Sequence, residues 1–492
     1  KSRWCLHGHQ DTDTGTFEIF APMPGTEAIT MFFQISLNES LRPGFLDIKN
    51  AFCQADKLNR PRGKIYAIPC EGIGVEKGRL IEIIAPIYGL DDSPLRWHLT
   101  LIKFFESLGF VRSLLEPCWM IKRSGGKIMA QVLIEVDDLN IATVPEYLDT
   151  LQAALKQRFI FGKWEHDTAD FAGRHVSAKP DKIIMHQEKY ILEKLHPIKL
   201  AKGRFSERSS SLTEEEFETF RSSLYKVNWV GHQTRPEAAG IVSILASRLK
   251  NATVHDVSCL NKLISHLRST ANQPLILHKF DSSKMIFIAA SDAGGVDGKP
   301  IGELNELQDT VQGAWVILAA DRVPSASSKT RVSILSWRSA KLKRRVTSTL
   351  ASEALAFSQA LGELERLQVM FRDVMHGDIN KTDWTLSILP FVGILKEDSA
   401  LCSKSKGERL EQCTIVDAKS LYDSLKKENP NSRQDRRTSI EVAIIIESMQ
   451  RSGSVLRWSP HPRMIADVLT KDDIGKSNGA LEELFKDRKS VV

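Results

Sequence analysis

Short apolar runs that lead into an acidic residue recur along this chain and constrain its fold more than any other feature of the sequence. In chain order, the acids are Asp47, the pair Asp137 and Asp138, Asp292, and Asp417. Runs of this length beside turn-forming residues are typical of β-strands. Stretches with helical spacing separate the runs, so the sequence predicts an α+β protein.

The length of the chain, 492 residues, exceeds what one hydrophobic core usually supports and predicts about two to four domains. Its 42% hydrophobic and 26% charged residues are typical of a folded protein. A net charge of +6 permits nucleic-acid binding without arguing for it. Seven scattered cysteines without a CxxC pair indicate neither a disulfide framework nor a zinc ribbon, and favour a reducing intracellular setting.

The patterning divides the chain into segments. Strand-like runs at 65–68 and 80–84 alternate with helical spacing at 95–108, which ends before Gly109. The polar, basic stretch 201–211 is the best linker candidate, and residues 212–280 are expected to be largely helical. Beyond this segment, strands are expected at 285–290, 314–318, 332–337 and 413–416, and a long helix at 350–374. No apolar run approaches the roughly 18 residues that cross a bilayer, and the chain, which starts at Lys1, is expected to be a piece of a longer protein.

The first acidic cluster centres on residues 132–142, which are predicted to form two strands joined at a turn made by Asp137 and Asp138. Adjacent carboxylates repel each other unless a cation neutralises them, although an exposed hairpin turn is the alternative. Asp47 adds a third acid at a strand end. Three such aspartates could hold two divalent ions about 4 Å apart, which activate a 3′-hydroxyl and stabilise a leaving pyrophosphate.

The second cluster contains Asp292, Glu353, Asp417 and Asp467. Acids from two strands, a helix and a late segment together suit a two-metal nuclease, although each acid alone could be an ordinary helix or strand cap. Glu353 follows Asp292 by 61 residues (353 − 292) and Asp417 follows Glu353 by 64 (417 − 353). These long spacings predict insertions near 296–312 and 376–411, or else a wrong placement of Asp417.

Beyond these acids, the chain resembles the copia-type reverse transcriptases along most of its length, because several motifs keep their order and spacing. In the first part, these are Lys1-Ser2-Arg3-Trp4 with Gly8 and Gln10, Phe20-Ala21-Pro22, Asp47 with Ala51-Phe52, Tyr88-Gly89-Leu90 with Pro94 and Trp97, Gly109-Phe110, Val136-Asp137-Asp138, Gln187 with Tyr190-Ile191, and Thr234-Arg235-Pro236. Further on, the family's ribonuclease H landmarks are resembled by Ser291-Asp292-Ala293, Ser336-Trp337-Arg338-Ser339, Ser348-Thr349 with Glu353, and Ala466-Asp467-Val468-Leu469-Thr470-Lys471.

This resemblance implies an architecture and an activity. Residues 1–195 would form the palm and fingers of a right-hand polymerase, 196–284 a mostly helical thumb or connection, 285–475 an RNase H-like α/β domain with a mixed sheet, and 476–492 a C-terminal tail. The implied function is RNA-directed DNA polymerase with ribonuclease H activity. The partners would be an RNA template, a DNA primer, an RNA–DNA hybrid and dNTPs, without a membrane. Protease and integrase segments of the same polyprotein are also implied. The setting would be a cytoplasmic virus-like particle, with the nucleus as an alternative.

The resemblance also assigns roles to residues. Two Mg²⁺ (or Mn²⁺) ions per site would be bound by Asp47, Asp137 and Asp138 in the polymerase and by Asp292, Glu353, Asp417 and Asp467 in the nuclease. Phe52 would exclude a ribose 2′-hydroxyl, and Lys1 and Arg3 would contact the incoming triphosphate.

Three positions depart from the family pattern. Glu135 replaces the family's tyrosine before Val-Asp-Asp and adds an anion beside the metal site. Asp92, beside Asp91, replaces a glutamine and would put negative charge where template and nucleotide pass. Ala418 replaces the asparagine after Asp417. The alternatives to an active bifunctional enzyme are therefore a relic that binds nucleic acid without polymerising and a nuclease without polymerase activity. A purely structural protein would not explain metal-type acids in two domains.

Two smaller clusters remain open. Lys341, Lys343, Arg344 and Arg345 could grip the backbone of a hybrid, and a solvated loop or a nuclear-import signal is equally compatible. Cys5, His7 and His9 could hold a metal, with odds of about one in twenty by ligand spacing.

Overall fold

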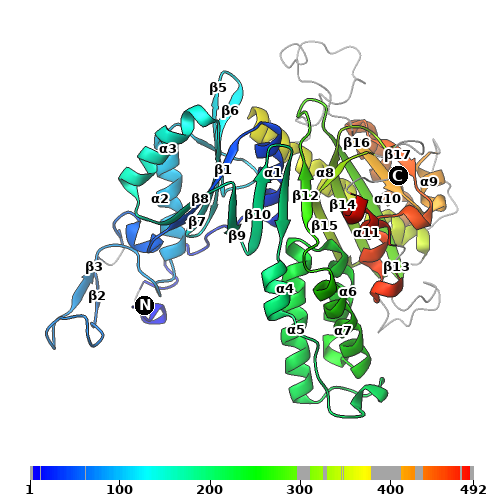
Figure 1. The fold of residues 1–492 in the computed structure, drawn as a ribbon, viewed down its shortest axis with the longest axis horizontal. Coiled ribbons are helices and arrows are strands. Elements are labelled where there is room, and N and C mark those ends of the chain that lie inside the picture. Colours follow the sequence, from blue (N-terminus) through cyan, green and yellow to red (C-terminus); the bar gives the residue numbers. More distant parts are fainter. Residues whose placement is uncertain are drawn as a thin grey trace. The chain divides into compact units, whose positions relative to one another are not determined.

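The computed structural model describes residues 4–11, 13–60, 63–295, 311–324, 330–344, 346, 348–377, 412–426, 436–476 and 479–487. They fall into two compact units (Figure 1). The first takes its residues from 1–32, 39–172 and 372–377, and the second from 33–38, 173–371 and 378–492. The predicted insertions at 296–312 and 376–411 lie almost entirely outside the described residues.

The first unit is built on a six-stranded sheet with the order β4-β5-β6-β7-β1-β8, in which every neighbouring pair is antiparallel. The strands are β1 (Arg42–Ile48), β4 (Val111–Arg112), β5 (Trp119–Ser124), β6 (Lys127–Glu135), β7 (Asp138–Thr143) and β8 (Phe161–His166). The other elements are η1 (Gly8–Gln10), α1 (Thr26–Asn38, whose residues 33–38 belong to the second unit), η2 (Ala51–Gln54), β2 (Ile65–Ala67), β3 (Ile81–Ile83), α2 (Ser93–Ser107), α3 (Pro145–Arg158) and β9 (Thr168–Phe171).

Local sequence explains the helix ends in this unit. Pro94 lies in the first turn of α2, where a missing backbone N–H costs nothing. After α2, Gly109 adopts a φ of +81°, the left-handed conformation that glycine accepts most readily. The predicted end of this helix before Gly109 is therefore confirmed. Pro145 starts α3 in the same way.

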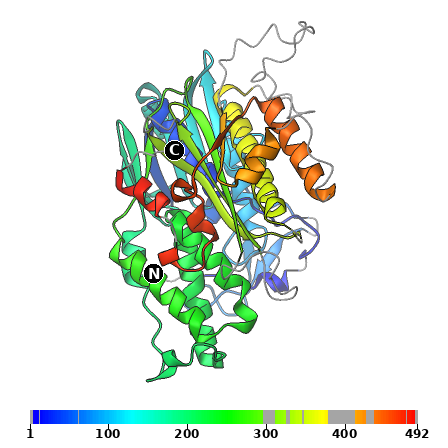
Figure 2. The same cartoon turned by 90° about the vertical axis from the view of Figure 1, so that its right-hand side faces the viewer.

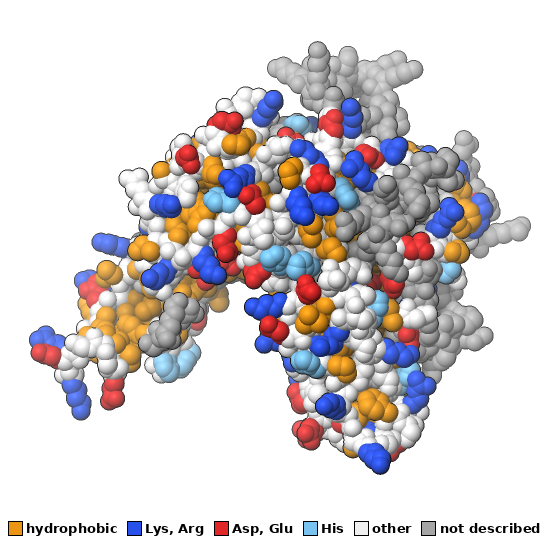
Figure 3. All heavy atoms as spheres, in the orientation of Figure 1, with side chains coloured by type: hydrophobic (Ala, Val, Ile, Leu, Met, Phe, Trp, Pro, Cys, Tyr) orange, Lys and Arg blue, Asp and Glu red, His pale blue; other side chains and the backbone are white. Residues whose placement is uncertain are grey.

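The two-stranded hairpin of β2 and β3 shows where strand periodicity misleads. Its predicted strands are present, with Ile65 opposite Ile83. However, the side chains of Tyr66, Ile68, Leu80 and Ile84 are exposed, and apolar side chains gather over this hairpin (Figure 3). Alternation therefore predicts the strands correctly without predicting burial.

The second unit begins with an antiparallel set of strands, β10 (Arg174–Lys179), β11 (Lys182–His186) and β12 (Leu275–His278). A helical layer follows in the chain, made of α4 (Glu188–Lys194), η3 (Arg204–Ser206), α5 (Glu214–Gln233), η4 (Pro236–Ala238), α6 (Ala239–Ser247), η5 (Leu249–Asn251) and α7 (Val254–Ser269). The prediction of a largely helical segment at 212–280 is confirmed except for β12. The predicted linker at 201–211 lies within this unit.

A five-stranded mixed sheet with the order β15-β14-β13-β16-β17 completes the second unit. Its strands are β13 (Ile286–Gly295), β14 (Val311–Ala320), β15 (Val332–Lys341), β16 (Gln412–Val416) and β17 (Val455–Trp458). β13 pairs antiparallel with β14 and parallel with β16. Parallel neighbours need a crossing connection, and helix α8 (Thr349–His376) precedes β16 in the chain.

The remaining elements are α9 (Lys419–Leu425), α10 (Arg436–Ser452), η10 (His461–Arg463), η11 (Asp467–Thr470), η12 (Ile474–Lys476) and α11 (Ala480–Asp487). Figure 2 shows α8 and α10 alongside each other, and a buried contact joins Glu365 of α8 to Ser448 of α10. A search of the described residues finds no helix with the length and hydropathy of a membrane span.

The Thr-Arg-Pro segment at 234–236 has a structural role in the second unit. The Thr234 hydroxyl donates to Oε1 of Gln187 at 3.0 Å. Arg235 is fully buried, and its Nε lies 2.5 Å from Oε1 of Glu237, which is also fully buried. Arg235 additionally donates to the carbonyl and the hydroxyl of Thr270, at 2.9 and 2.6 Å. The arginine therefore joins the end of α5 to the end of α7.

Replacement of Arg235 by methionine should destabilise the second unit strongly, because it leaves the Glu237 carboxylate buried without its partner. Breaking a buried pair in this way costs about 3–5 kcal/mol. The exposed pair of Arg42 and Asp167 offers a matched control, and Arg42→Met should cost less than about 1 kcal/mol. Urea unfolding followed by circular dichroism measures both, and equal small shifts would contradict the structural role of Arg235.

Candidate active sites

The first candidate site is built on the hairpin of β6 and β7. Glu135 pairs with Asp138, so Val136 and Asp137 form a two-residue turn and Asp138 opens β7. The prediction of a turn made by both aspartates was therefore wrong by one residue. Val136 has a φ of 53°, which is unusual for a β-branched side chain and marks local strain. The buried Trp97 donates from Nε1 to the Val136 carbonyl at 2.5 Å and supports the turn.

Asp47 lies next to this hairpin because β1 pairs with β7, with Asp47 opposite Asp138. Residues directly opposite each other in antiparallel strands project from the same face. Asp47, Asp138 and Glu135 therefore form a row across three strands. Gly162 on β8 lies so close that a Cβ there would be 2.3 Å from Oδ2 of Asp47, so this position accepts only glycine without a shift.

Burial raises the pKa of Asp138 to about 6, and the charges of Asp137 and Asp47 add to this effect. All three aspartates are half-buried. Their oxygen atoms are the ligand type that Mg²⁺ prefers, so the residues fit a divalent cation chemically. In the described part of the chain, however, these three do not bring one oxygen each within 4.8 Å of the others, as the second cluster does.

Asp92 does not act as the sequence suggested. Its side chain is 1% exposed, and Oδ1 accepts from Nη2 of Arg60 at 2.6 Å. Arg96 contacts the other carboxylate oxygen. The expectation that Asp92 repels template and nucleotide is therefore wrong, because two arginines neutralise this carboxylate inside the unit.

Phe52, the predicted steric gate, is the second residue of η2. This helix begins directly after Asn50, which has a φ of 53°. The ring of Phe52 packs against Tyr88, with ring centroids 4.9 Å apart. The structure thus brings the segment after Asp47 together with the Tyr-Gly-Leu segment. Lys1 and Arg3, the predicted triphosphate contacts, lie outside the described residues.

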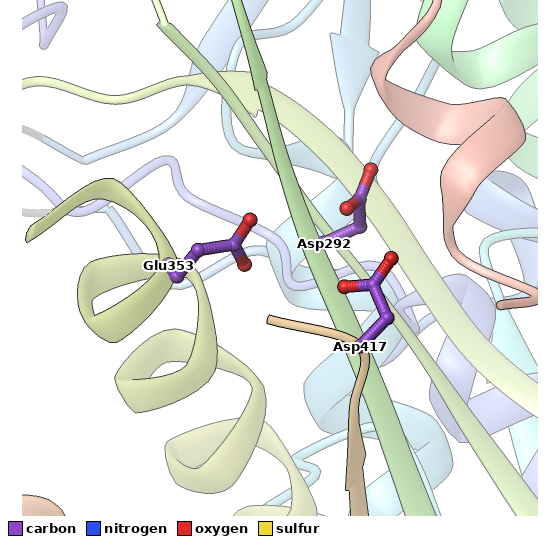
Figure 4. A group of neighbouring side chains, drawn as sticks. All are labelled: Asp292, Glu353 and Asp417. Atoms are coloured by element: carbon purple, nitrogen blue, oxygen red, sulfur yellow. The ribbon is translucent and has the colours of Figure 1, made fainter. Parts of the chain in front are cut away.

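The second candidate site brings together Asp292, Glu353 and Asp417, each of which offers a carboxylate oxygen within 4.8 Å of the others (Figure 4). Asp292 projects from β13, in the strand rather than after it as predicted. Glu353 comes from the second turn of α8, and Asp417 follows the last residue of β16. The predicted placement of Asp417 agrees with this geometry despite the long spacings.

Burial makes this cluster electrostatically demanding. Asp292 and Glu353 are 4% and 5% exposed. Burial, followed by the charge of Asp417, raises the pKa of Asp292 to about 6. Burial and the charges of Asp292 and Asp417 also raise the pKa of Glu353 well above its usual value. Three oxygen donors in an anionic pocket of this kind fit a divalent cation.

Asp467 approaches the same cluster from η11 and is fully buried. Its Oδ1 lies 2.7 Å from Nζ of Lys471 and 3.6 Å from Nε2 of His461. Nδ1 of His461 lies 3.1 Å from Oδ2 of Asp417, so the imidazole bridges two of the acids. The hydroxyl of Thr470 contacts Oδ2 of Asp292.

Sequence reasoning missed His461, Thr470 and Lys471 because it searched for acids. Thr470 and Lys471 lie in the motif that includes Asp467, which was read only for its carboxylate. The signal that could have identified His461 is its place between two prolines, which fixes the backbone, six residues before Asp467.

The two smaller clusters have a mixed outcome. Lys341 and Lys343 are exposed, whereas Arg344 pairs with Glu441 of α10 at 2.7 Å. Arg345 lies outside the described residues. The rings of His7 and His9 lie 5.5 Å apart and Cys5 is exposed. Within the described residues, no metal-type grouping forms there.

Comparison with known proteins finds a family model and relatives that agree with each other. Residues 1–204 match the family model described as reverse transcriptase (RNA-dependent DNA polymerase). The chain is 22% identical over 293 residues to the retrovirus-related Pol polyprotein from transposon RE1 of Arabidopsis thaliana, covering 56% of this chain and 19% of that protein. It is also 22% identical over 320 residues to the Pol polyprotein from transposon TNT 1-94 of Nicotiana tabacum, covering 61% and 24%. The chain thus spans about a fifth to a quarter of these relatives.

A solved structure of the foamy viral protease-reverse transcriptase in complex with double-stranded DNA aligns with 92% of this chain and 62% of its own, at 10% identity and a TM-score of 0.46. That score is too low to establish a shared fold. The family match and the relatives do confirm the resemblance on which the motifs agree. The chain is similar to the Pol polyproteins of plant retrotransposons, and its residues 1–204 match the reverse transcriptase family model.

Proposed function

We propose that this chain is an RNA-directed DNA polymerase with ribonuclease H activity, which copies element RNA into DNA by two-metal-ion catalysis. The observation that carries the proposal is the register of β1 with β7, which sets Asp47 opposite Asp138 beside the Asp137 turn. This happens inside the segment that matches the reverse transcriptase family. The substrates would be an RNA template, a DNA primer and dNTPs.

In the polymerase site, divalent ions would activate the primer 3′-hydroxyl and stabilise the leaving pyrophosphate. Asp47, Asp137 and Asp138 would hold these ions. The half-buried Phe52, braced by Tyr88, would form an apolar wall that excludes a ribose 2′-hydroxyl. The Trp97 hydrogen bond supports the turn that presents Asp137.

In the nuclease site, divalent ions held by Asp292, Glu353 and Asp417, with Asp467 alongside, would polarise the phosphodiester of an RNA strand. His461 lies at the edge of the cluster, with a 61% exposed side chain. We assign it the transfer of a proton to the leaving 3′-oxygen, because its imidazole is exposed and lies against both Asp417 and Asp467. The exposed Lys341 and Lys343 would contact the backbone of the hybrid.

A nuclease without polymerase activity is the second candidate, and Glu135 favours it. This half-buried side chain stands opposite Asp138 and adds a third carboxylate to the row. Asp92 no longer supports that candidate, because Arg60 and Arg96 neutralise it. Placement in a cytoplasmic virus-like particle is a further part of the proposal, and it rests on the resemblance of the sequence motifs.

Asp137→Asn should lower the rate of primer extension on an RNA template by roughly 10²–10³-fold or more, because it removes a charge that stabilises the transition state. Asp149→Asn, which changes an exposed aspartate on α3, should extend primers like the unchanged chain. Extension is measured with Mg²⁺ and a labelled DNA primer. No extension by the unchanged, folded chain would leave the nuclease-only candidate.

Asp292→Asn should abolish cleavage of an RNA–DNA hybrid while primer extension continues, because the two acid clusters serve different reactions. Glu447→Gln, at an exposed position on α10, is the matched control and should cleave normally. Cleavage of a labelled hybrid and extension of a primer are measured on the same preparations. Undiminished cleavage by Asp292→Asn would contradict the nuclease assignment.

The same substitution should stabilise the chain in EDTA. The pKa of Asp292 is raised to about 6 from the usual 3.8, so its ionised form opposes folding. This group's contribution to stability is present below about pH 4, is lost as pH rises through about 6, and reaches its full penalty above that. Asp292→Asn should therefore raise the melting temperature at pH 7.5. The corresponding gain in the free energy of unfolding is at most about 3 kcal/mol.

That gain should shrink as the pH falls below about 6 and should vanish well below 3.8, where Asp292 is protonated and uncharged in both states. Thermal melts of the unchanged chain, Asp292→Asn and Glu447→Gln across this range check the sign. A gain that stays constant with pH would show that relief of charge repulsion is not its cause.

A further inference from the structure

We propose that Lys471 is a tethered counter-ion of the Asp292 cluster, whose ammonium occupies the place beside Asp467 until a divalent ion displaces it. This inference rests on the proposed nuclease function. It assigns Lys471 a positioning role. The lysine sets the affinity of the site for a divalent ion, because the ion must exchange with the ammonium group.

The first observation is the contact itself. Nζ of Lys471 lies 2.7 Å from Oδ1 of Asp467, which is fully buried, while the lysine side chain is 27% exposed. A buried carboxylate beside three others is costly unless a positive charge accompanies it. The lysine supplies that charge from the solvent side of the cluster, where its head group keeps a path to water.

The charge of Lys471 acts on more than its direct partner. It lowers the raised pKa values of Asp292 and Glu353. In turn, Asp292, Asp467 and Asp417 all raise the pKa of Lys471 against the effect of burial. The ammonium therefore acts electrostatically on the whole cluster and not only on Asp467.

The backbone that carries Lys471 is fixed, so the lysine has a defined range. Thr470 contacts Asp292 through its hydroxyl, and Ser339 of β15 contacts the Leu469 carbonyl. A Cβ at Gly294 would lie 2.9 Å from Cβ of Thr470, and one at Gly240 would lie 2.6 Å from the carbonyl carbon of Leu469. These close approaches pin η11 against the sheet and α6, and leave the long lysine side chain as the part that can move.

The chemistry of the two cations makes exchange the natural outcome. An ammonium is a compact charge on a flexible four-carbon stem, whereas a divalent ion brings twice the charge and needs fixed oxygen ligands. Both seek the oxygens of Asp467, and like charges at this distance repel strongly in a partly buried site. A divalent ion next to Asp467 therefore requires the ammonium to swing toward solvent.

Lys471→Met tests the proposal, because it keeps the unbranched apolar stem of the side chain and removes the charged end group. Mn²⁺ binding is measured by isothermal titration calorimetry on the full chain, and the heat that Asp292→Asn removes defines binding at this site. We expect Lys471→Met to bind Mn²⁺ there at least about tenfold more tightly. We also expect it to melt a few degrees lower in EDTA, since it leaves the acids without their counter-ion.

Two further variants make the result specific. Lys471→Arg keeps the charge and should retain the affinity and the EDTA melting temperature of the unchanged chain to within about twofold and about one degree. Lys262→Met removes an exposed lysine that pairs with Asp473 at 2.6 Å and not with an acid of the cluster, and should change neither quantity.

The outcomes separate this inference from the proposed function. Unchanged or weaker Mn²⁺ binding by a folded Lys471→Met protein would overturn the counter-ion role and leave the lysine a purely structural partner of Asp467. If the unchanged chain and Asp292→Asn bind Mn²⁺ identically, the proposed metal site fails instead.

Discussion

Repulsion between buried carboxylates is the constraint on which both candidate sites depend. At Asp138 and at Asp292, burial and neighbouring aspartates raise the pKa to about 6, so ionisation at neutral pH opposes folding. Such groups persist only where the surrounding scaffold is stable enough to hold them. A bound cation would offset the free energy by which the ionised carboxylates destabilise the fold. The sheets around each site provide that scaffold.

Close backbone approach is the means by which the scaffold holds the acids. Gly162 admits the Asp47 carboxylate against β8, and Gly294 admits Thr470 against β13. Neither glycine has a positive φ. The reason for glycine at these positions is therefore the contact that a Cβ would make with the side chain of Asp47 or of Thr470. The strained Val136 is the counterpart in the turn, where Trp97 contributes the hydrogen bond that offsets the unusual backbone.

The sequence predicted the strands, the long helix and the gathering of Asp292, Glu353 and Asp417 because these depend on local periodicity and on motif order. It could not predict the fate of Asp92, because burial beside Arg60 depends on a residue 32 positions away in the chain. His461 was missed for the same reason, since its value comes from two acids that only the fold brings to it. The exposed Tyr66 and Ile68 show that an apolar strand pattern does not establish burial.

The two sites differ in how their charge is balanced within the chain. At the Asp292 cluster, Lys471 and Thr470 partly offset the effect of burial. At the hairpin, burial, Asp137 and Asp47 all act on Asp138 in the same direction, and Glu135 stands on the same face. In the proposed polymerase, Glu135 would therefore act through electrostatics, by deepening the anionic field that an incoming triphosphate approaches, since phosphate and carboxylate repel unless divalent ions stand between them.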